Sequence, residues 1–343
     1  MSLFPRFICN KATLLSFAVL SSFSVSLPVA MATEPAALTI YNSQDKGPVE
    51  AVAAAYEKKT GVKITFRDNG APALAQQIIA EGKKTPADIF YAEYTSALVS
   101  LSNKGLLADI PAGSFQQIPA QYSDNQHKWL GITARSFVIM YNQTMIHEEQ
   151  LPHSVMDFAK PEWQGKFAYN PRAAAFLEMI VAVEKTVGYD AAKNWLAGIK
   201  KNGKAYPTNT AMVLDVDRGE VATAINGDNY WLAVAKDKGA DKLNVKVHYV
   251  GHQDPGALIT VSGVGIPEYA PHRAEAEKFV AYLVSPEGQN ILAQAAGDTP
   301  LRPGIISAVA LKPFDKLDAS PVTSAQIGDA SDALQLEKAV GLN

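Results

Sequence analysis

The stretch "ALTIYNSQDKGPVEAVAAAYEKKTGVKITFRDN" (37–69) decides the fold class, because two hydrophobic periods follow one another along it. Residues 37–45 alternate apolar and polar side chains and end in polar ones, which is typical of a strand that runs into a loop. Residues 49–61 place apolar side chains at helical spacing and end in a glycine, the residue that helix C-termini favour. "VKITFRDN" (62–69) then returns to the strand pattern. The stretch therefore predicts a strand, a helix and a second strand.

The chain after this stretch repeats the same alternation. "APALAQQIIAEGKK" (71–84) has the spacing of a helix, "PADIFYAE" (86–93) reads as a third strand, and "TSALVSLSNKG" (95–105) reads as the next helix. Strands and helices that alternate in this way form parallel sheets with helices packed on their faces. The predicted fold class is therefore α/β.

Polar side chains follow each of these three strands. Asp45, Asn69 and Glu93 stand where the predicted strands end. Because ligands of open α/β sheets bind beyond the carboxyl ends of the strands, these positions are candidates for a binding site.

Two long extended segments indicate two lobes. "LGITARSFVIMYN" (130–142) and "KVHYVGHQDPGALITVSGVGIP" (246–267) are separated by a second full set of α/β segments. We expect two α/β lobes joined by these two crossing segments. The N-terminal lobe is predicted to comprise residues 33–136 plus 260–310, and the C-terminal lobe residues 137–259 plus 311–343.

The first 32 residues have the pattern of a cleaved secretory signal. Two basic residues precede an apolar, serine-rich run, and Ala30-Met31-Ala32 is a small-x-small cleavage site. Cleavage would leave 311 of the 343 residues, with 29 basic and 34 acidic side chains and no cysteine. We therefore expect a secreted protein that is not inserted in the membrane after cleavage. The mild net negative charge argues against nucleic acid as a partner.

The sequence contains none of the common catalytic motifs. It lacks a Gly-x-Ser-x-Gly elbow, a phosphate-binding Gly-x-x-x-x-Gly-Lys-Ser/Thr loop and a His-Glu-x-x-His pair. His248 and His252 are four residues apart but lie in an extended stretch, so they do not share a helical face. An enzyme therefore has no motif to support it.

Oxygen donors remain as the candidate chemistry. In "AINGDNYWLAVAKD" (224–237), Tyr230 stands where a small apolar strand gives way to a helix. Asp45, Glu93 and Tyr230 are hard donors, which highly charged cations prefer over sulfur or imidazole. A phenol titrates near pH 10 and must lose its proton to bind a metal, so a strong Lewis acid such as ferric iron is favoured. Taken one by one, each of these residues fits an ordinary capping or solvated role better than a ligand role.

At this point several segments match a known family. The chain resembles the periplasmic ferric-ion-binding proteins of bacterial ABC importers, in order and over nearly all of the mature chain. The segments that carry the resemblance are "LTIYNSQ" (38–44), "PADIFYAE" (86–93), "KWLGITARSFVIMYN" (128–142), "KPEWQGKFAYNP" (160–171) and "HQDPGALITVSGVGIP" (252–267). The resemblance implies a two-lobed Venus-flytrap protein that holds Fe(III) in its cleft, with carbonate or phosphate as a synergistic anion, and delivers the iron to an ABC transporter permease in the inner membrane.

The resemblance also implies a set of iron ligands. The family's glutamate ligand, which follows the "PAD-x-F" strand, falls on Glu93. The second of its two adjacent tyrosines falls on Tyr230, whereas the first falls on Asn229. The histidine that many members carry after the first strand is replaced by Asp45.

Anion-binding positions carry over as well. Asn209 in "YPTNTA" (206–211) matches the family's anion-binding asparagine. The anion loop reads "NPRAAAF" (170–176) and lacks the usual hydroxyl, so that Arg172, Ala173 and Ala174 stand at its positions.

The sequence leaves two possibilities open for the molecule that the protein binds. The three negative donors Asp45, Glu93 and Tyr230 balance a 3+ ion, which favours ferric iron with a modified site. The asparagine at position 229 favours the alternative, a relative that binds an organic phosphate or an intact ferric chelate. Tyr94 is a further candidate ligand, although its side chain is expected to point away from Glu93 if the strand continues.

Overall fold

The computed structural model describes residues 37–295, 298–306 and 312–342, and the predicted signal lies outside them. The strands are β1 (Ala37–Asn42), β2 (Lys63–Asp68), β3 (Ile89–Ala92), β4 (Trp129–Asn142), β5 (Phe167–Tyr169), β6 (Lys204–Ala205), β7 (Thr223–Gly227), β8 (Val245–His248), β9 (Ile259–Gly265) and β10 (Thr299–Pro300). The α-helices are α1 (Lys46–Thr60), α2 (Ala71–Glu81), α3 (Thr95–Asn103), α4 (Ala112–Phe115), α5 (Ala174–Val187), α6 (Tyr189–Asn202), α7 (Asn209–Arg218), α8 (Asp228–Lys238), α9 (Arg273–Leu283), α10 (Pro286–Ala295), α11 (Ser324–Ile327) and α12 (Ser331–Val340).

The predicted α/β alternation is confirmed in the first half of the chain. β1 pairs in parallel with both β2 and β3, and helices α1, α2 and α3 follow the three strands. Gly61 ends α1 in the left-handed conformation, with φ of 79°, as a helix C-terminus requires. The carboxyl ends of β1 and β3 therefore open at one edge of the sheet.

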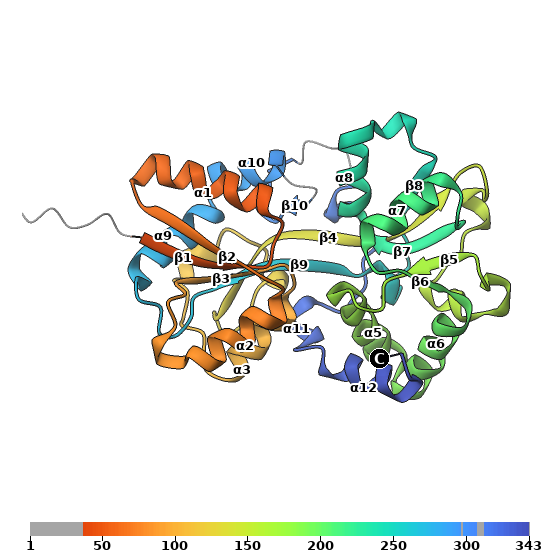
Figure 1. Ribbon diagram of the computed structural model, residues 1–343, viewed down its shortest axis with the longest axis horizontal. Helices are drawn as coiled ribbons and strands as arrows, with labels where there is room; N and C mark the ends of the chain where they lie inside the picture. The colour runs from red at the N-terminus through yellow and green to blue at the C-terminus, as the bar shows by residue number, and fades with distance from the viewer. Residues whose placement is uncertain (1–36, 296–297, 307–311, 343) are drawn as a thin grey trace, which may run out of the picture. The chain divides into compact units, whose positions relative to one another are not determined.

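The two halves share one sheet through β4 and β9 (Figure 1). The first part of β4 (129–136) pairs antiparallel with β9, whereas its second part (137–142) pairs with β7 and β8. All fourteen residues of β4 are buried. The long crossing strand predicted from the sequence is thus a shared spine of both halves, and the two-lobed α/β fold is confirmed.

The second extended segment is broken in the structure. The sequence predicts extended backbone over 246–267, but β8 ends at His248 and β9 begins at Ile259. Between them Pro255, which has no amide hydrogen, begins a 3₁₀ turn that Asp254 caps by accepting a hydrogen bond from the Gly256 amide (2.7 Å). Within this segment, the chain therefore reaches the first half only where β9 begins.

The chain also crosses between the halves a third time. β10 pairs with β4 at Thr133 and Ala134 in the first half, after which α12 packs against α5 and α6 in the second half. The predicted lobe boundaries at residues 136, 259 and 310 stay predictions.

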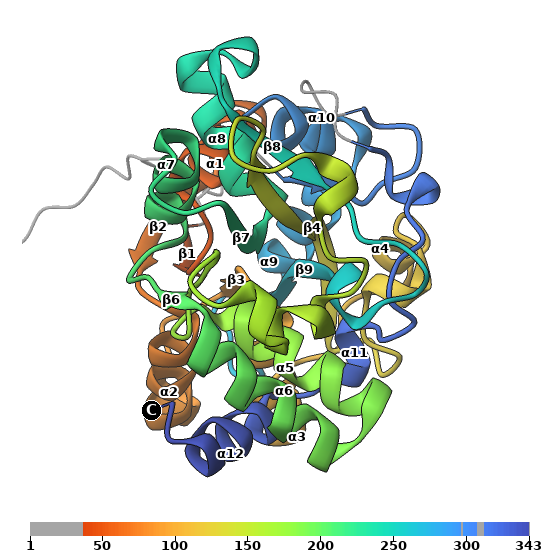
Figure 2. The same cartoon turned by 90° about the vertical axis from the view of Figure 1, so that its right-hand side faces the viewer.

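Each half has apolar layers on both faces of the sheet. In the first half α1, α9 and α10 cover one face and α2 and α3 the other. In the second half α7 and α8 cover one face, and α5, α6 and α12 the other (Figure 2). None of the helices in the described part of the chain has the length and apolar character needed to cross a membrane.

Candidate metal centre

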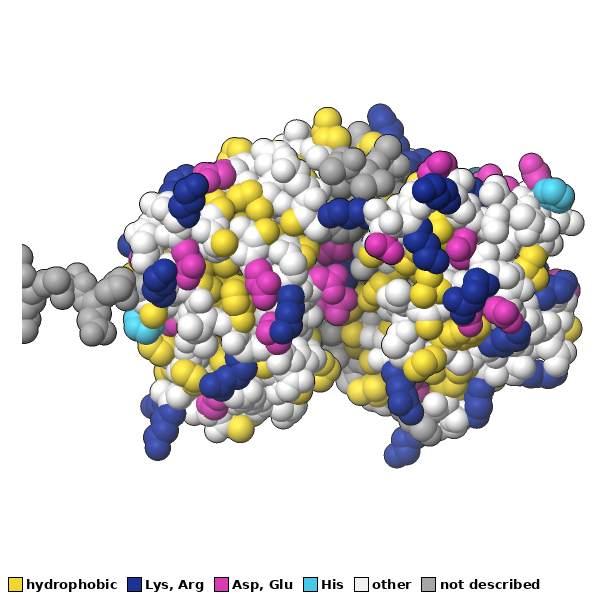
Figure 3. Space-filling view, turned by 45° about the horizontal axis from the view of Figure 1, so that its top comes forward, with side chains coloured by type: hydrophobic (Ala, Val, Ile, Leu, Met, Phe, Trp, Pro, Cys, Tyr) yellow, Lys and Arg dark blue, Asp and Glu magenta, His cyan; other side chains and the backbone are white. Residues whose placement is uncertain are grey.

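The loops after β1 and β3 are tied together at the edge of the sheet. The Glu93 amide donates to Ser43 Oγ (3.0 Å), and the Ser43 amide donates to the Tyr91 carbonyl (2.9 Å). These bonds fix where the Glu93 carboxylate emerges from the strand. Figure 3 shows acidic side chains gathered in a groove between the two halves.

Arg135 is the central charge of this site. Its side chain lies in β4 and is only 2% exposed. Nη1 donates to Glu93 Oε1 (2.9 Å) and Nη2 donates to Asp298 Oδ2 (2.6 Å). Although burial alone would lower the pKa of Arg135, the carboxylate of Asp298 and the neighbouring Tyr94 and Glu93 raise it well above its ordinary value. The guanidinium is therefore a permanent positive charge between two carboxylates.

Asp298 has three hydrogen-bond donors around one oxygen. Besides Arg135, Thr133 Oγ1 donates to Asp298 Oδ2 (2.9 Å), and so does Gln44 Nε2 (3.1 Å). Asp298 thereby neutralises the positive charge of Arg135. Arg135 therefore does not offset the negative charges of the candidate donors Asp45, Glu93 and Tyr230. Neither residue was predicted from the sequence as part of the site, although a lone arginine in an apolar strand such as "LGITARSFVIMYN" (130–142) indicates a buried carboxylate partner.

Tyr230 meets Glu93 from the second half. It lies in the first turn of α8, directly after β7, and its hydroxyl donates to Glu93 Oε1 (3.4 Å). Burial, followed by the charge of Glu93, raises the pKa of Tyr230, while hydrogen bonds from Asn209 and Tyr94 oppose this. Two residues 137 positions apart in the chain are thus brought together as predicted.

The pKa of Glu93 is also raised. Burial is the largest cause, and the negative charges of Asp45 and Asp298 add to it, whereas Arg135 lowers the pKa. A cation placed between Glu93 and Tyr230 would lower the pKa of both groups and favour the carboxylate and the phenolate.

Asp45 stands apart from this contact. Its side chain is exposed, and its amide donates to Gln44 Oε1 (2.9 Å). Loss of water around the carboxyl group, followed by the charge of Asp298, raises the pKa of Asp45, and Arg135 lowers it. Within the described residues, no three carboxylate, imidazole or thiol groups form a ready metal cluster.

Asn209 begins α7 and links two other asparagines. Its Oδ1 accepts from Asn170 Nδ2 (3.0 Å), and its carbonyl accepts from Asn226 Nδ2 (3.0 Å). Asn170 also precedes the loop that leads into α5, where its Oδ1 accepts from the Arg172 amide (3.0 Å). The predicted anion-binding asparagine and the predicted anion loop are thus connected.

The side chains of this loop are less engaged. The Arg172 side chain is exposed and makes no ion pair within the described part of the chain. Ala173 is the N-cap of α5, and no side chain caps the helix there. Ala174 follows as its first residue, so amide donors at this helix start are available to an anion.

Asn229 is buried next to Tyr230 but does not join the Glu93 contact. It is 5% exposed, and its Oδ1 has no hydrogen-bond partner in the described residues. An amide oxygen that receives no donor at this depth is costly.

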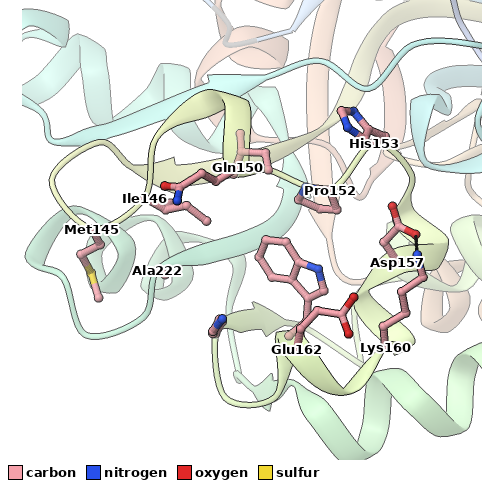
Figure 4. Close-up of a pocket in the computed structure, with 12 residues that line it drawn as sticks. Met145, Ile146, Gln150, Pro152, His153, Asp157, Lys160, Glu162 and Ala222 are labelled. Atoms are coloured by element: carbon pink, nitrogen blue, oxygen red, sulfur yellow. Dashed lines mark ion pairs between the residues drawn. The ribbon is translucent and has the colours of Figure 1, made fainter.

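A larger pocket lies away from these residues. Its volume is about 620 Å³, and it is formed in the second half by the loop around Met145–His153 and the turns around Asp157–Lys166 (Figure 4). Lys160 and Asp157 form an ion pair at its edge (2.6 Å). None of the candidate site residues lines it.

Comparison with known proteins identifies the class of this two-lobed protein. Residues 51–317 match the bacterial extracellular solute-binding protein family, and the chain belongs to this family. It is 36% identical over 307 residues to the major ferric iron-binding protein of Neisseria meningitidis, covering 89% of this chain and 93% of that protein. It is 32% identical to the Fe(3+)-binding periplasmic protein of Serratia marcescens, covering 94% and 95%. The structure of iron-bound HitA from Pseudomonas aeruginosa superimposes with a TM-score of 0.86 at 40% identity, covering 90% of this chain and all of that one.

Proposed function

We propose that this chain is the periplasmic solute-binding protein of an ABC importer, and that it captures ferric iron in the groove and delivers it to the permease. The observation that carries the proposal is the approach of Tyr230 and Glu93 from opposite halves, 3.4 Å apart. The likeness to ferric-binding proteins over most of the chain supports it. The protein acts as a monomer, is cut after Ala32, and is not an enzyme.

Glu93 and Tyr230 are the proposed iron ligands, with Asp45 as a third donor that approaches when iron binds. A carboxylate and a phenolate are hard donors suited to a trivalent cation. Because Asp298 neutralises Arg135, the three donors still balance a 3+ ion. When the phenolate forms, the proton of Tyr230 passes to solvent or to the chelator that delivers the iron.

A carbonate or phosphate anion completes the site in this proposal. Asn209 would donate to it through its side-chain amide, and the amide of Ala174 would donate at the start of α5. Ala173 would hold its place as the N-cap, since its own amide donates to the Asn170 carbonyl (3.2 Å). Arg172 would turn toward the anion and bind it bidentately. The two lobes would be residues 33–136 plus 260–310 and 137–259 plus 311–343.

Titration of the chelator-stripped protein with ferric nitrilotriacetate tests the proposal. We expect a visible charge-transfer band from phenolate to iron. In competition with citrate, Tyr230→Phe should weaken iron binding at least about 10-fold, equivalent to ~1.4 kcal/mol. Tyr56→Phe is the matched control, because its hydroxyl also donates to a carboxylate, Glu275 (2.6 Å), but lies outside the groove.

Absence of the band in the unmodified protein would contradict ferric binding through tyrosine. The asparagine at position 229, where a tyrosine ligand is expected from the resemblance, leaves one alternative, an organic phosphate or an intact ferric chelate bound in the same groove. A thermal-shift screen with organic phosphates and with ferric citrate would then identify that ligand.

A further inference from the structure

Tyr94 lies at the end of β3 in a position that the strand pattern does not predict. The strand ends at Ala92, and Tyr94 is the N-cap of α3. If the strand continued, the side chains of Glu93 and Tyr94 would point to opposite faces. Because it does not continue, the two neighbours can lie on the same side.

Both side chains converge on Arg135. Glu93 Oε1 accepts from Arg135 Nη1 (2.9 Å), and the guanidinium carbon lies 5.2 Å from the centre of the Tyr94 ring. The ring is 4% exposed and packs in the apolar core of the second half, which includes Phe137 and Phe176. Tyr94 thus comes from the first half of the chain but packs in the second, and its ring is fixed in place.

The hydroxyl of Tyr94 is directed to the candidate metal centre. It lies near the hydroxyl of Tyr230, and its proximity lowers the pKa of that tyrosine. The charges of Glu93 and Tyr230 in turn raise the pKa of Tyr94, after the larger effect of burial. Three oxygen donors therefore meet at one point: the Glu93 carboxylate and the hydroxyls of Tyr94 and Tyr230.

Asn229 adds no anionic donor to this group. Its neutral amide oxygen is buried without a partner and does not join the contact between Glu93 and Tyr230. Asp45 is exposed and is coupled to Glu93 only through its charge. The hydroxyl of Tyr94, whose ring lies against Arg135 beside Glu93, can become a hard anionic ligand.

We propose that Tyr94 is a second tyrosine ligand of the bound iron and supplies the phenolate that Asn229 cannot. The assignment rests on the proposed function, since it presumes ferric iron as the cargo. On binding, each phenol oxygen forms a bond to iron, and its proton leaves to solvent or to the incoming chelator. Arg135 lies beneath the ring of Tyr94 and stabilises the phenolate electrostatically.

The test compares ferric nitrilotriacetate titrations of the unmodified protein, Tyr94→Phe, Tyr230→Phe and the double variant. We expect the charge-transfer absorbance per bound iron to fall by about half in each single variant and to vanish in the double variant, since each phenolate contributes separately. Phenylalanine keeps the packing of the Tyr94 ring, and Tyr56→Phe again serves as the control.

A Tyr94→Phe variant with the full band and unchanged iron affinity would overturn the assignment while leaving the proposed function intact. Failure of the unmodified protein to bind iron at all would instead overturn the proposed function. An ultraviolet difference spectrum of the unmodified protein needs no variant. It counts the tyrosines that ionise when iron binds: two agree with the assignment, and one contradicts it.

Discussion

Arg135 is the residue on which the charge of the groove depends. A guanidinium buried in the middle of an apolar strand requires carboxylate partners, and Glu93 and Asp298 supply them. The bond to Glu93 also aims that carboxylate across the groove at Tyr230. Arg135 therefore acts on stability and on the site together.

Replacing Arg135 by leucine should destabilise the protein by about 3–5 kcal/mol, because two carboxylates are left without their buried cation. Urea unfolding at neutral pH measures this. Arg273→Leu is the control, since Arg273 is exposed and pairs with Glu277 on the same helix, where loss of the pair should cost less than about 1 kcal/mol. Equal losses of unfolding free energy in the two variants would show that the buried ion pairs stabilise the protein no more than the exposed pair.

Single residues of the site could be predicted where they follow a strand. Glu93 directly follows β3, and Tyr230 lies in the first turn of the helix that follows β7. The local sequence pattern identifies such positions. Arg135 and Asp298 could not be placed, because 163 residues separate them and only the pairing of β10 with β4 brings Asp298 close. Tyr94 was judged from strand alternation, which fails because α3 begins one residue later.

A second unusual group, Glu178 of α5, lies near the start of α3. Glu178 of α5 is fully buried, and neither of its oxygens has a hydrogen-bond partner within the described residues. Burial raises its pKa from 4.5 to about 8, against the lowering effects of Arg135 and the Ser96 amide, while Glu93 adds to the rise. Glu178 is therefore protonated in the folded protein at neutral pH.

This protonation makes stability fall with rising pH. Below pH 4.5 the carboxyl group of Glu178 is protonated in both states. Between pH 4.5 and about 8 the unfolded chain releases this proton while the folded chain keeps it, so the group lowers the unfolding free energy by up to ~1.4 kcal/mol per pH unit. Glu178→Gln should therefore gain stability relative to the unmodified protein between pH 5 and pH 8.

Urea unfolding of both proteins at the two pH values measures the gain. Glu277→Gln on α9 is the control for loss of a carboxyl group outside the core. If the difference between Glu178→Gln and the unmodified protein is the same at pH 5 and pH 8, the carboxyl group does not stay protonated in the folded state.

At the scale of the whole molecule, β4 and β9 decide how the halves can move. β4 continues from one half to the other, and β9 begins at Ile259 where the chain returns to the first half, so a change in the angle between halves must bend the sheet near residues 136 and 259, where β4 exchanges β9 for β7 and β8. The long apolar stretch 130–142 predicts the crossing of β4, whereas the second predicted crossing segment, 246–267, is broken by the 3₁₀ turn that begins at Pro255. The predicted assignment of residues 260–310 and 311–343 to different lobes also implies a third passage, and its position in the chain stays a prediction.

Iron bound by Glu93 and Tyr230 would hold the halves together, because each ligand belongs to a different half. A ligand that binds the closed form more tightly shifts the population toward it. We therefore expect a smaller radius of gyration by small-angle X-ray scattering for the ferric protein than for the chelator-stripped protein. In Tyr230→Phe the decrease should require more iron, whereas in Tyr56→Phe it should match the unmodified protein. An equal radius with and without iron would mean that the contact between Tyr230 and Glu93 closes the groove by itself, and that iron enters a protein already closed.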